Sequence, residues 1–224
     1  MTRKAEQESR VVVKPLAILT TVVRIRGTAP YVQHKFSQKA LDQIRATQEA
    51  GQQAKGKKVR KPKDFDEVFE GATHVSTEGW YGIPAHSFRA AMIRACSLIG
   101  FKMTMARLSF WVKGDGFDDS DGAPLVKIHG TRERHQTYAR NANGQPDLRD
   151  RPMWRDWFAD LTVQWDEDQF SGEDMVNLLR RAGLQVGIGE GRPGSKNSAG
   201  CGWGTFDVDE LNPKPGSKPK DFRE

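Results

Sequence analysis

A glycine-rich segment, GIGEGRPGSKNSAGCGWG at residues 187–204, is the most unusual part of this sequence. Glycine is used where the backbone needs a positive φ or must let another group approach closely. Free N–H groups beside a cation suit the binding of phosphate, and the cations here are Arg192 and Lys196. The segment is neither a Walker loop nor a dinucleotide fingerprint, because it lacks Gly-Lys-Ser/Thr and lies between an expected helix and an expected strand. We predict that Gly187, Gly189, Arg192 and Lys196 contact a nucleic-acid backbone; a simple helix-to-strand connection is the alternative.

A second cationic segment, GQQAKGKKVRKPK at residues 51–63, holds six Lys or Arg and no acid. Almost nothing in it is apolar, so it cannot offset the entropy of its own ordering and is expected to be a mobile insertion. Mobile cations beside a domain neutralise phosphates without reading sequence. Lys57, Lys58 and Arg60 are therefore predicted to contact nucleic acid, with a solvated charged surface as the alternative.

Arginines are interleaved with aromatic residues over residues 127–157, and we expect the part from 130 to 157 to be irregular. Aromatic faces next to guanidinium groups suit stacking on unpaired bases. Arg132 and Arg134 are predicted to hold phosphates and Trp154 to be a stacking platform. Trp157 adjoins a predicted strand and is equally well explained as a core residue.

Catalytic and metal chemistry has weaker support. His129 and His135 near the arginines would suit a metal-independent ribonuclease, but the sequence assigns them no nucleophile or orienting partner. The acidic run at residues 114–122 lacks the closing glutamate of an EF-hand, so a solvated loop is expected and a weak cation site is the alternative. The Cys and His spacings do not form a zinc site. We predict no cofactor and no metal.

Composition limits the class of protein. The 224 residues are 37% hydrophobic and 29% charged, and the formal net charge of +6 favours a polyanionic partner. Cys96 and Cys201 form no disulfide framework, which indicates a reducing compartment, and Cys96 is expected to be a small buried side chain. The first residues contain no signal-peptide core, and no segment is apolar enough to span a membrane, so we expect a cytoplasmic protein.

Hydrophobic periodicity predicts alternating strands and helices. The first strand, residues 16–26, directs Arg24 and Arg26 away from its apolar face, and both are predicted to hold phosphates of a nucleic acid. A helix capped by Ser37 follows, with Leu41 and Ile44 on its inner face. The other expected elements are irregular strands over 65–83, a helix from Pro84 to Gly100, strands near 107–113, 125–129 and 159–165, a helix from Ser171 to Gly183, and a strand at 205–208.

This order predicts an α+β fold, with helices on one face of a mainly antiparallel sheet and a ferredoxin-like, RNA-recognition-type core carrying insertions. The predicted organisation is a disordered tail at 1–14, a single α+β domain at 15–211, and a disordered Pro/Lys tail at 212–224.

Three blocks carry a resemblance to known proteins: RIRGTAPYVQHKFS, GIPAHSFRAAMIRA, and LLRRAGLQVGIGEGRPG with the later GWGTFDV. Over residues 15–208 the chain resembles a family of small bacteriophage and prophage proteins, which implies a viral gene. Its layout is also distantly similar to the RAMP superfamily, which includes the backbone-forming subunits of CRISPR effector complexes. That likeness implies a ferredoxin-like core that holds single-stranded RNA in stacked subunits. It places Gly187, Gly189, Arg192 and Gly204 in the superfamily's glycine-rich loop, and residues 51–63 in an insertion.

The sequence therefore predicts a non-catalytic protein that binds single-stranded nucleic acid, RNA or DNA, as a homo-oligomer along the strand. The first alternative is a RAMP-like endoribonuclease that uses His129 or His135. The second is a viral protein that binds and blocks a host nucleic-acid-processing complex.

Overall fold

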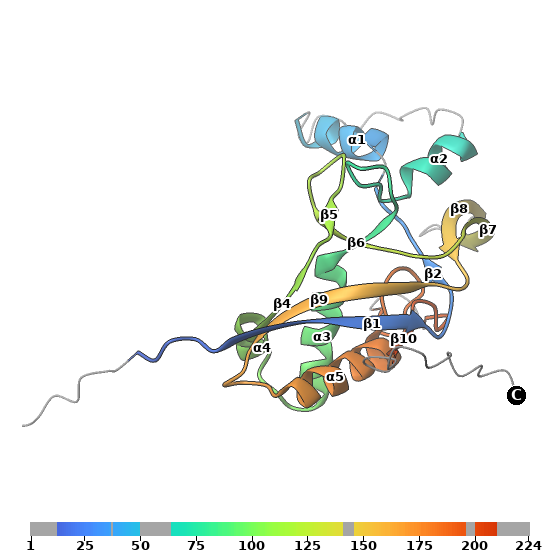
Figure 1. Cartoon of the computed structure of the whole chain (residues 1–224). Coiled ribbons are helices and arrows are strands. Elements are labelled where there is room, and N and C mark those ends of the chain that lie inside the picture. The colour runs from blue at the N-terminus through green and yellow to red at the C-terminus, as the bar shows by residue number, and fades with distance from the viewer. Residues whose placement is uncertain (1–12, 37, 50–63, 141–145, 196–199, 210–224) are drawn as a thin grey trace, which may run out of the picture.

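The computed structural model describes residues 13–36, 38–49, 64–140, 146–195 and 200–209 (Figure 1). These residues form an α+β fold in which the paired strands run antiparallel. Most of the predicted tails at 1–14 and 212–224, and the basic insertion at 51–63 with Lys57, Lys58 and Arg60, lie outside the described residues. Among the described helices, none combines the length and apolarity needed to cross a membrane.

The largest sheet has the strand order β10-β1-β9-β4. Its strands are β1 (Ile18–Gly27), β4 (Phe110–Lys113), β9 (Phe158–Asp166) and β10 (Phe206–Val208). The predictions for the first strand, for the strand at 159–165 and for the last strand are confirmed. β1 lies between β9 and β10, two strands from the C-terminal third of the chain.

One face of this sheet is the core face. Val23 and Ile25 on β1 alternate with Arg24 and Arg26, as the period of two predicts, and both apolar side chains are buried. Ala159, Leu161, Val163 and Trp165 on β9 share the same buried cluster.

Two helices cover the core face: α3 (Ala85–Leu98) and α5 (Gly172–Arg181). Figure 1 shows α3 crossing behind β1 and β9, with α5 below them. The sequence explains both starts. Pro84 precedes α3, and α5 begins with a capping box in which Ser171 and Asp174 bond each other's backbone N–H groups. Cys96 is buried in α3, as predicted.

A π-helical turn, η2 (Ala182–Val186), joins α5 to the glycine-rich loop. Gly183, predicted to end the helix, lies inside this turn. A Cβ atom there would stand 1.9 Å from the carbonyl oxygen of Phe206, so only glycine allows β10 to pack this closely.

The remaining strands form two smaller sheets, of orders β2-β8-β7 and β3-β6-β5. The first is mainly a long hairpin of β7 (Arg132–Arg140) and β8 (Pro146–Trp154), which β2 (Tyr31–Val32) extends. The prediction that 130–157 is irregular is therefore wrong. Charged and polar residues occupy both faces of the segment over much of its length. The alternation of apolar and polar residues that identifies a strand is therefore missing. The second small sheet comprises β3 (Gly82–Pro84), β5 (Gly116–Phe117) and β6 (Pro124–Lys127).

Three further helices lie outside the main sheet: α1 (Gln38–Glu49), α2 (Phe65–Gly71) and α4 (Met103–Ser109). α2 replaces the start of the irregular strands predicted for 65–83, and the Asp64 carboxylate caps it by accepting from two backbone N–H groups. α4 replaces the first half of the strand predicted at 107–113, which leaves Leu108 69% exposed. Leu41 and Ile44 were predicted to face inward on α1, but they are exposed.

Candidate nucleic-acid interface

The face of the main sheet opposite α3 and α5 gathers two of the predicted arginines. Because β1 alternates, Arg24 and Arg26 point away from the core and are about half exposed. The register pairs Arg26 with Phe158 and Arg24 with Asp160 on β9. Cross-strand partners share a face of the sheet, so these four side chains form one outer patch.

Phe158 lies at the centre of this patch. The Arg24 guanidinium carbon is 4.9 Å from the centroid of its ring, and that of Arg26 is 5.7 Å away. His129 forms an isolated β-bridge with Phe158 and stacks on its ring, with the ring centroids 4.4 Å apart and the ring planes 5° from parallel. The patch is therefore a row of flat groups in the order imidazole, phenyl, guanidinium.

The two arginines differ in how firmly they are paired. Arg24 donates to both carboxylate oxygens of Asp160, at 2.7 and 2.8 Å. This hydrogen bonding raises the pKa of Arg24 and lowers that of Asp160. The ion pair of Arg26 with Asp209 is longer, at 3.4 Å, and joins one nitrogen to one oxygen. The Arg26 guanidinium is thus the more available of the two for a phosphate.

An exposed aromatic side chain extends the same face beyond the half-buried Phe158. Trp111 on β4 pairs with Gln164, alternates with the buried Phe110, and is 42% exposed. The Arg89 guanidinium carbon lies 5.5 Å from its ring centroid. Neither Phe158 nor Trp111 is among the binding residues predicted from the sequence. The signal was present, because each is next to a buried apolar residue in a strand and so must face outward.

Arg132 and Arg134 lie elsewhere, between the hairpin and α2. Arg132 donates to both oxygens of Glu70, at 2.9 and 2.8 Å, and Arg134 donates to Asp66 at 2.6 Å. Both guanidinium carbons lie 4.6 Å from the Phe69 ring centroid. These contacts hold α2 against β7, so the structure gives both arginines a positioning role there. It does not bring them together with Arg24 and Arg26 in one set of contacts.

Trp154 is not a stacking platform in this structure. Its side chain is fully buried, and its ring lies 5.7 Å from that of Tyr31 and 6.1 Å from that of Tyr81. The prediction was wrong because β8 turns its last residues into the core as it approaches β9. Trp157 is also a core residue, and its indole N–H donates to the carbonyl oxygen of Ala29 at 3.0 Å.

The glycine-rich loop uses its backbone mainly to pack against the protein. Gly187 and Gly189 have φ values of 67° and 71°. A Cβ atom on Gly189 would stand 2.5 Å from the carbonyl oxygen of Val32. Arg192 turns back to donate to the carbonyl oxygen of Gly189 at 2.8 Å. Lys196 lies outside the described residues.

Several N–H groups of the loop are also engaged internally. Those of Ile188, Glu190 and Gly204 donate to the carbonyl oxygens of Gly204, Val32 and Pro30. These groups therefore fix the loop beside β2 and are not directed at a ligand.

The acidic run at 114–122 is not simply a solvated loop. Asp118 is buried and accepts from Lys35 at 2.6 Å and from Ser120, and it lies 2.6 Å from the Nδ1 atom of His74. Burial alone would raise the pKa of Asp118, but these hydrogen bonds hold it well below its usual range. In the described part of the chain, no three His, Cys, Asp or Glu residues gather as a metal site.

The two candidate catalytic histidines lie in different surroundings. His129 stacks on Phe158, whereas His135 lies edge-on to Trp203 with ring centroids 5.2 Å apart.

No protein-family model matches this sequence, and no curated protein matches it either.

Proposed function

We propose that this chain is a non-catalytic single-stranded nucleic-acid-binding protein with a ferredoxin-like core. The topology supports such a core: β1, α3, β4, β9, α5 and β10 follow one another as βαββαβ, and the four strands stand in the order β10-β1-β9-β4. RNA-recognition domains of this layout stack bases on aromatic side chains of the open sheet face.

The outer patch of Arg24, Arg26, Phe158 and Asp160, together with His129 stacked on Phe158, carries the proposal. It combines flat groups on which an unpaired base can stack with exposed cations that can take the neighbouring phosphate. Trp111 offers a further stacking surface along the same face. Single strands fit this arrangement better than duplexes, because the base faces of a duplex are already stacked.

Fluorescence anisotropy tests the proposal with labelled single-stranded RNA, single-stranded DNA and duplex DNA of equal length, at two salt concentrations. Salt-sensitive binding, tighter for a single-stranded form than for the duplex, is expected. Absence of binding to all three at low salt would contradict it, and a protein partner in a host complex would then be the function to test.

Self-association along the strand is part of the proposal. Large apolar side chains are exposed at the end of α3 and on the neighbouring helix α4, at Leu98, Ile99 just after α3, Met105 and Leu108. Such a patch favours contact with a second copy. Light scattering after size-exclusion chromatography should show larger particles when a long single strand is added, and Leu108→Gln should reduce them. One protein per strand, whatever its length, would rule this part out.

Cleavage of RNA is the second candidate, because His129 lies within the proposed binding patch. His129→Phe keeps a flat ring on Phe158 while removing the proton-transfer group. If the protein only binds, this variant retains its affinity and wild type leaves RNA intact without added metal. Cut RNA that disappears with this variant would establish an enzyme instead.

A further inference from the structure

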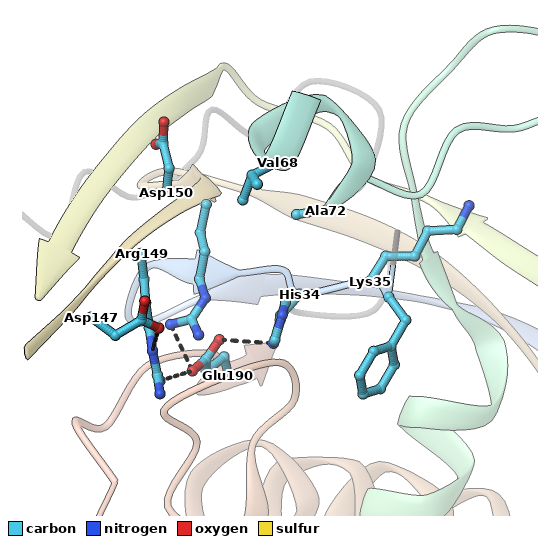
Figure 2. A pocket seen from close by; sticks show the side chains of 10 residues that line it. His34, Lys35, Val68, Ala72, Asp147, Arg149, Asp150 and Glu190 are labelled. Carbon is cyan, nitrogen blue, oxygen red and sulfur yellow. Dashed lines mark ion pairs between the residues drawn. The ribbon is translucent and has the colours of Figure 1, made fainter. Parts of the chain in front are cut away.

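A pocket of about 370 Å³ opens between the glycine-rich loop, the hairpin and α2 (Figure 2). Glu190 of the loop is met by residues from two other parts of the chain: His34 just after β2, and Arg149 and Arg151 on β8. Lys35, Asp147 and Asp150 also line the pocket. Figure 2 shows Arg149 and His34 directed at Glu190 from opposite sides. The pocket is distinct from the patch around Phe158.

Glu190 is an anion surrounded by cationic or hydrogen-donating groups. Its Oε1 atom lies 2.7 Å from Nη1 of Arg151 and 3.7 Å from Nη1 of Arg149, and its Oε2 atom lies 3.7 Å from Nδ1 of His34. Only the Arg151 contact has the length of a hydrogen bond. The buried Oε2 atom has no hydrogen-bond partner among the described residues. Asp147 lies 3.7 Å from Nε of Arg149, so the Arg149 guanidinium is shared between two carboxylates, each farther away than a hydrogen bond.

Cations and anions are balanced in the pocket, with Lys35, Arg149 and Arg151 against Asp147, Asp150 and Glu190, and the two arginines are the cations next to Glu190. The Arg151 side chain is 8% exposed, so its charge is largely removed from water. Burial and the nearby Arg151 lower the pKa of His34, although Glu190 opposes this. A phosphate monoester carries about two negative charges and three terminal oxygens, so it would meet these donors better than a carboxylate does.

An aromatic ring stands beside the cations. Phe36 lines the pocket, is 61% exposed, and lies with its ring centroid 5.9 Å from that of His34. An exposed phenylalanine next to a phosphate-binding group is suited to stacking on a base. Because a pocket admits an end of a chain more easily than a continuous backbone, the geometry favours a terminal nucleotide.

We infer that this pocket binds the terminal phosphate of a single-stranded nucleic acid, with Arg149, Arg151 and His34 as donors after the Glu190 side chain turns aside. Phe36 stacks on the terminal base. Glu190 occupies the place of the phosphate in the free protein, and its flanking residues Gly189 and Gly191, at φ values of 71° and 70°, keep the loop backbone close to the pocket. This inference rests on the proposed function.

The Glu190 carboxylate and the terminal phosphate would compete for the same donors. Substitutions in this one pocket should therefore change the affinity for a phosphorylated end in opposite directions. Glu190→Gln removes the internal anion and should raise the affinity for a phosphorylated end. Arg149→Gln removes a donor and should lower it. If the Glu190 ion pairs only join the loop to the hairpin, neither variant should alter the preference for one kind of strand end over another.

The experiment is a competition in which full-length protein holds a labelled single strand and unlabelled strands of equal length displace it. The competitors carry a 5′-phosphate, a 3′-phosphate or hydroxyl groups at both ends. One phosphorylated end should compete about tenfold more strongly than the hydroxyl ends. Glu190→Gln should enlarge this ratio, and Arg149→Gln and Phe36→Ala should reduce it. Arg155→Gln is the matched control, since Arg155 is exposed, pairs with Glu133 and does not line the pocket.

Equal competition by all three strands would overturn the inference while leaving the proposed function standing. If no strand binds, the proposed function fails, and the pocket is tested alone by calorimetry with uridine 5′-monophosphate. Binding that Arg149→Gln abolishes would then support the phosphate site, and absence of binding would overturn it.

Discussion

Phe158 and His129 are partners in a β-bridge, and their rings stack almost in parallel, with 5° between the ring planes. Arg26 lies on the other side of Phe158 in the same cross-strand row. The phenyl ring therefore supports both an imidazole and a guanidinium, and a base that binds this face extends an existing stack instead of building a new one.

Phe158→Ala should remove the support of that stack and weaken binding to single strands by about 1–3 kcal/mol. Anisotropy titration measures the change at fixed salt. Phe117→Ala is the matched control, because Phe117 is an exposed phenylalanine on β5, in a different sheet. Equal losses for the two variants would show that Phe158 has no specific role.

Arg26→Gln should weaken binding to all sequences to a similar degree and reduce the salt slope by about one phosphate contact. The expectation follows from its weak pairing with Asp209 at 3.4 Å. Arg181→Gln serves for comparison, since Arg181 is exposed on α5, the helix that covers the core face. A salt slope that stays at the wild-type value would remove Arg26 from the interface.

Trp154→Ala should destabilise the protein by about 3–5 kcal/mol, because it empties a fully buried site between Tyr31 and Tyr81. Urea denaturation measures the loss. Trp154→Phe keeps part of the volume and should cost less, while its affinity for single strands stays at the wild-type level. A selective loss of affinity in the Phe variant, with stability unchanged, would restore the stacking role.

Gly204→Ala should destabilise the glycine-rich loop more than Gly202→Ala. Both residues have a positive φ, at 67° and 75°, so both variants carry a backbone cost of about 1–2 kcal/mol. Only at Gly204 would the added Cβ atom also collide, 1.8 Å from the carbonyl oxygen of Ile188. The difference in unfolding midpoint between the two isolates this close approach, and identical midpoints would mean that the loop moves freely.

Acidification should destabilise the fold in two stages. Burial lowers the pKa of His34 and His74, so the unfolded chain takes up protons first and the free energy of unfolding falls below about pH 6.5. Below about pH 4, Asp118 adds to the loss, because its pKa in the folded state is held far beneath the unfolded value. Urea midpoints across this range measure both stages. A midpoint that rises on going from neutral to mildly acidic pH would contradict the prediction.

Period-two alternation was sufficient to predict the main sheet and the orientation of Arg24 and Arg26, since half-buried strands show their apolar face in the sequence. The capping signals at Pro84 and Ser171 likewise identified α3 and α5. The hairpin was missed because its charged residues pair with one another instead of facing water: Arg134 is within 3.3 Å of the buried Asp150. A charged residue paired in this way can be buried, so its charge does not indicate exposure.

The candidate site shows the same limit. Composition suggested that cations dominate, but Arg24, Arg132 and Arg134 are each paired with a carboxylate from another part of the chain. These pairs have sequence separations of 136, 62 and 68 residues, so local patterns could not reveal them. The Glu190 pocket joins three distant segments for the same reason.

The position of β1 has a consequence for biosynthesis. This strand leaves the ribosome early, yet its two partners, β9 and β10, are the segments 158–166 and 206–208. During translation the backbone of β1 must therefore wait for β9 and β10 before its hydrogen bonds in the sheet can form. A nascent chain that stalls before residue 158 carries an unpaired apolar strand, which makes it a substrate for chaperones and a source of aggregation.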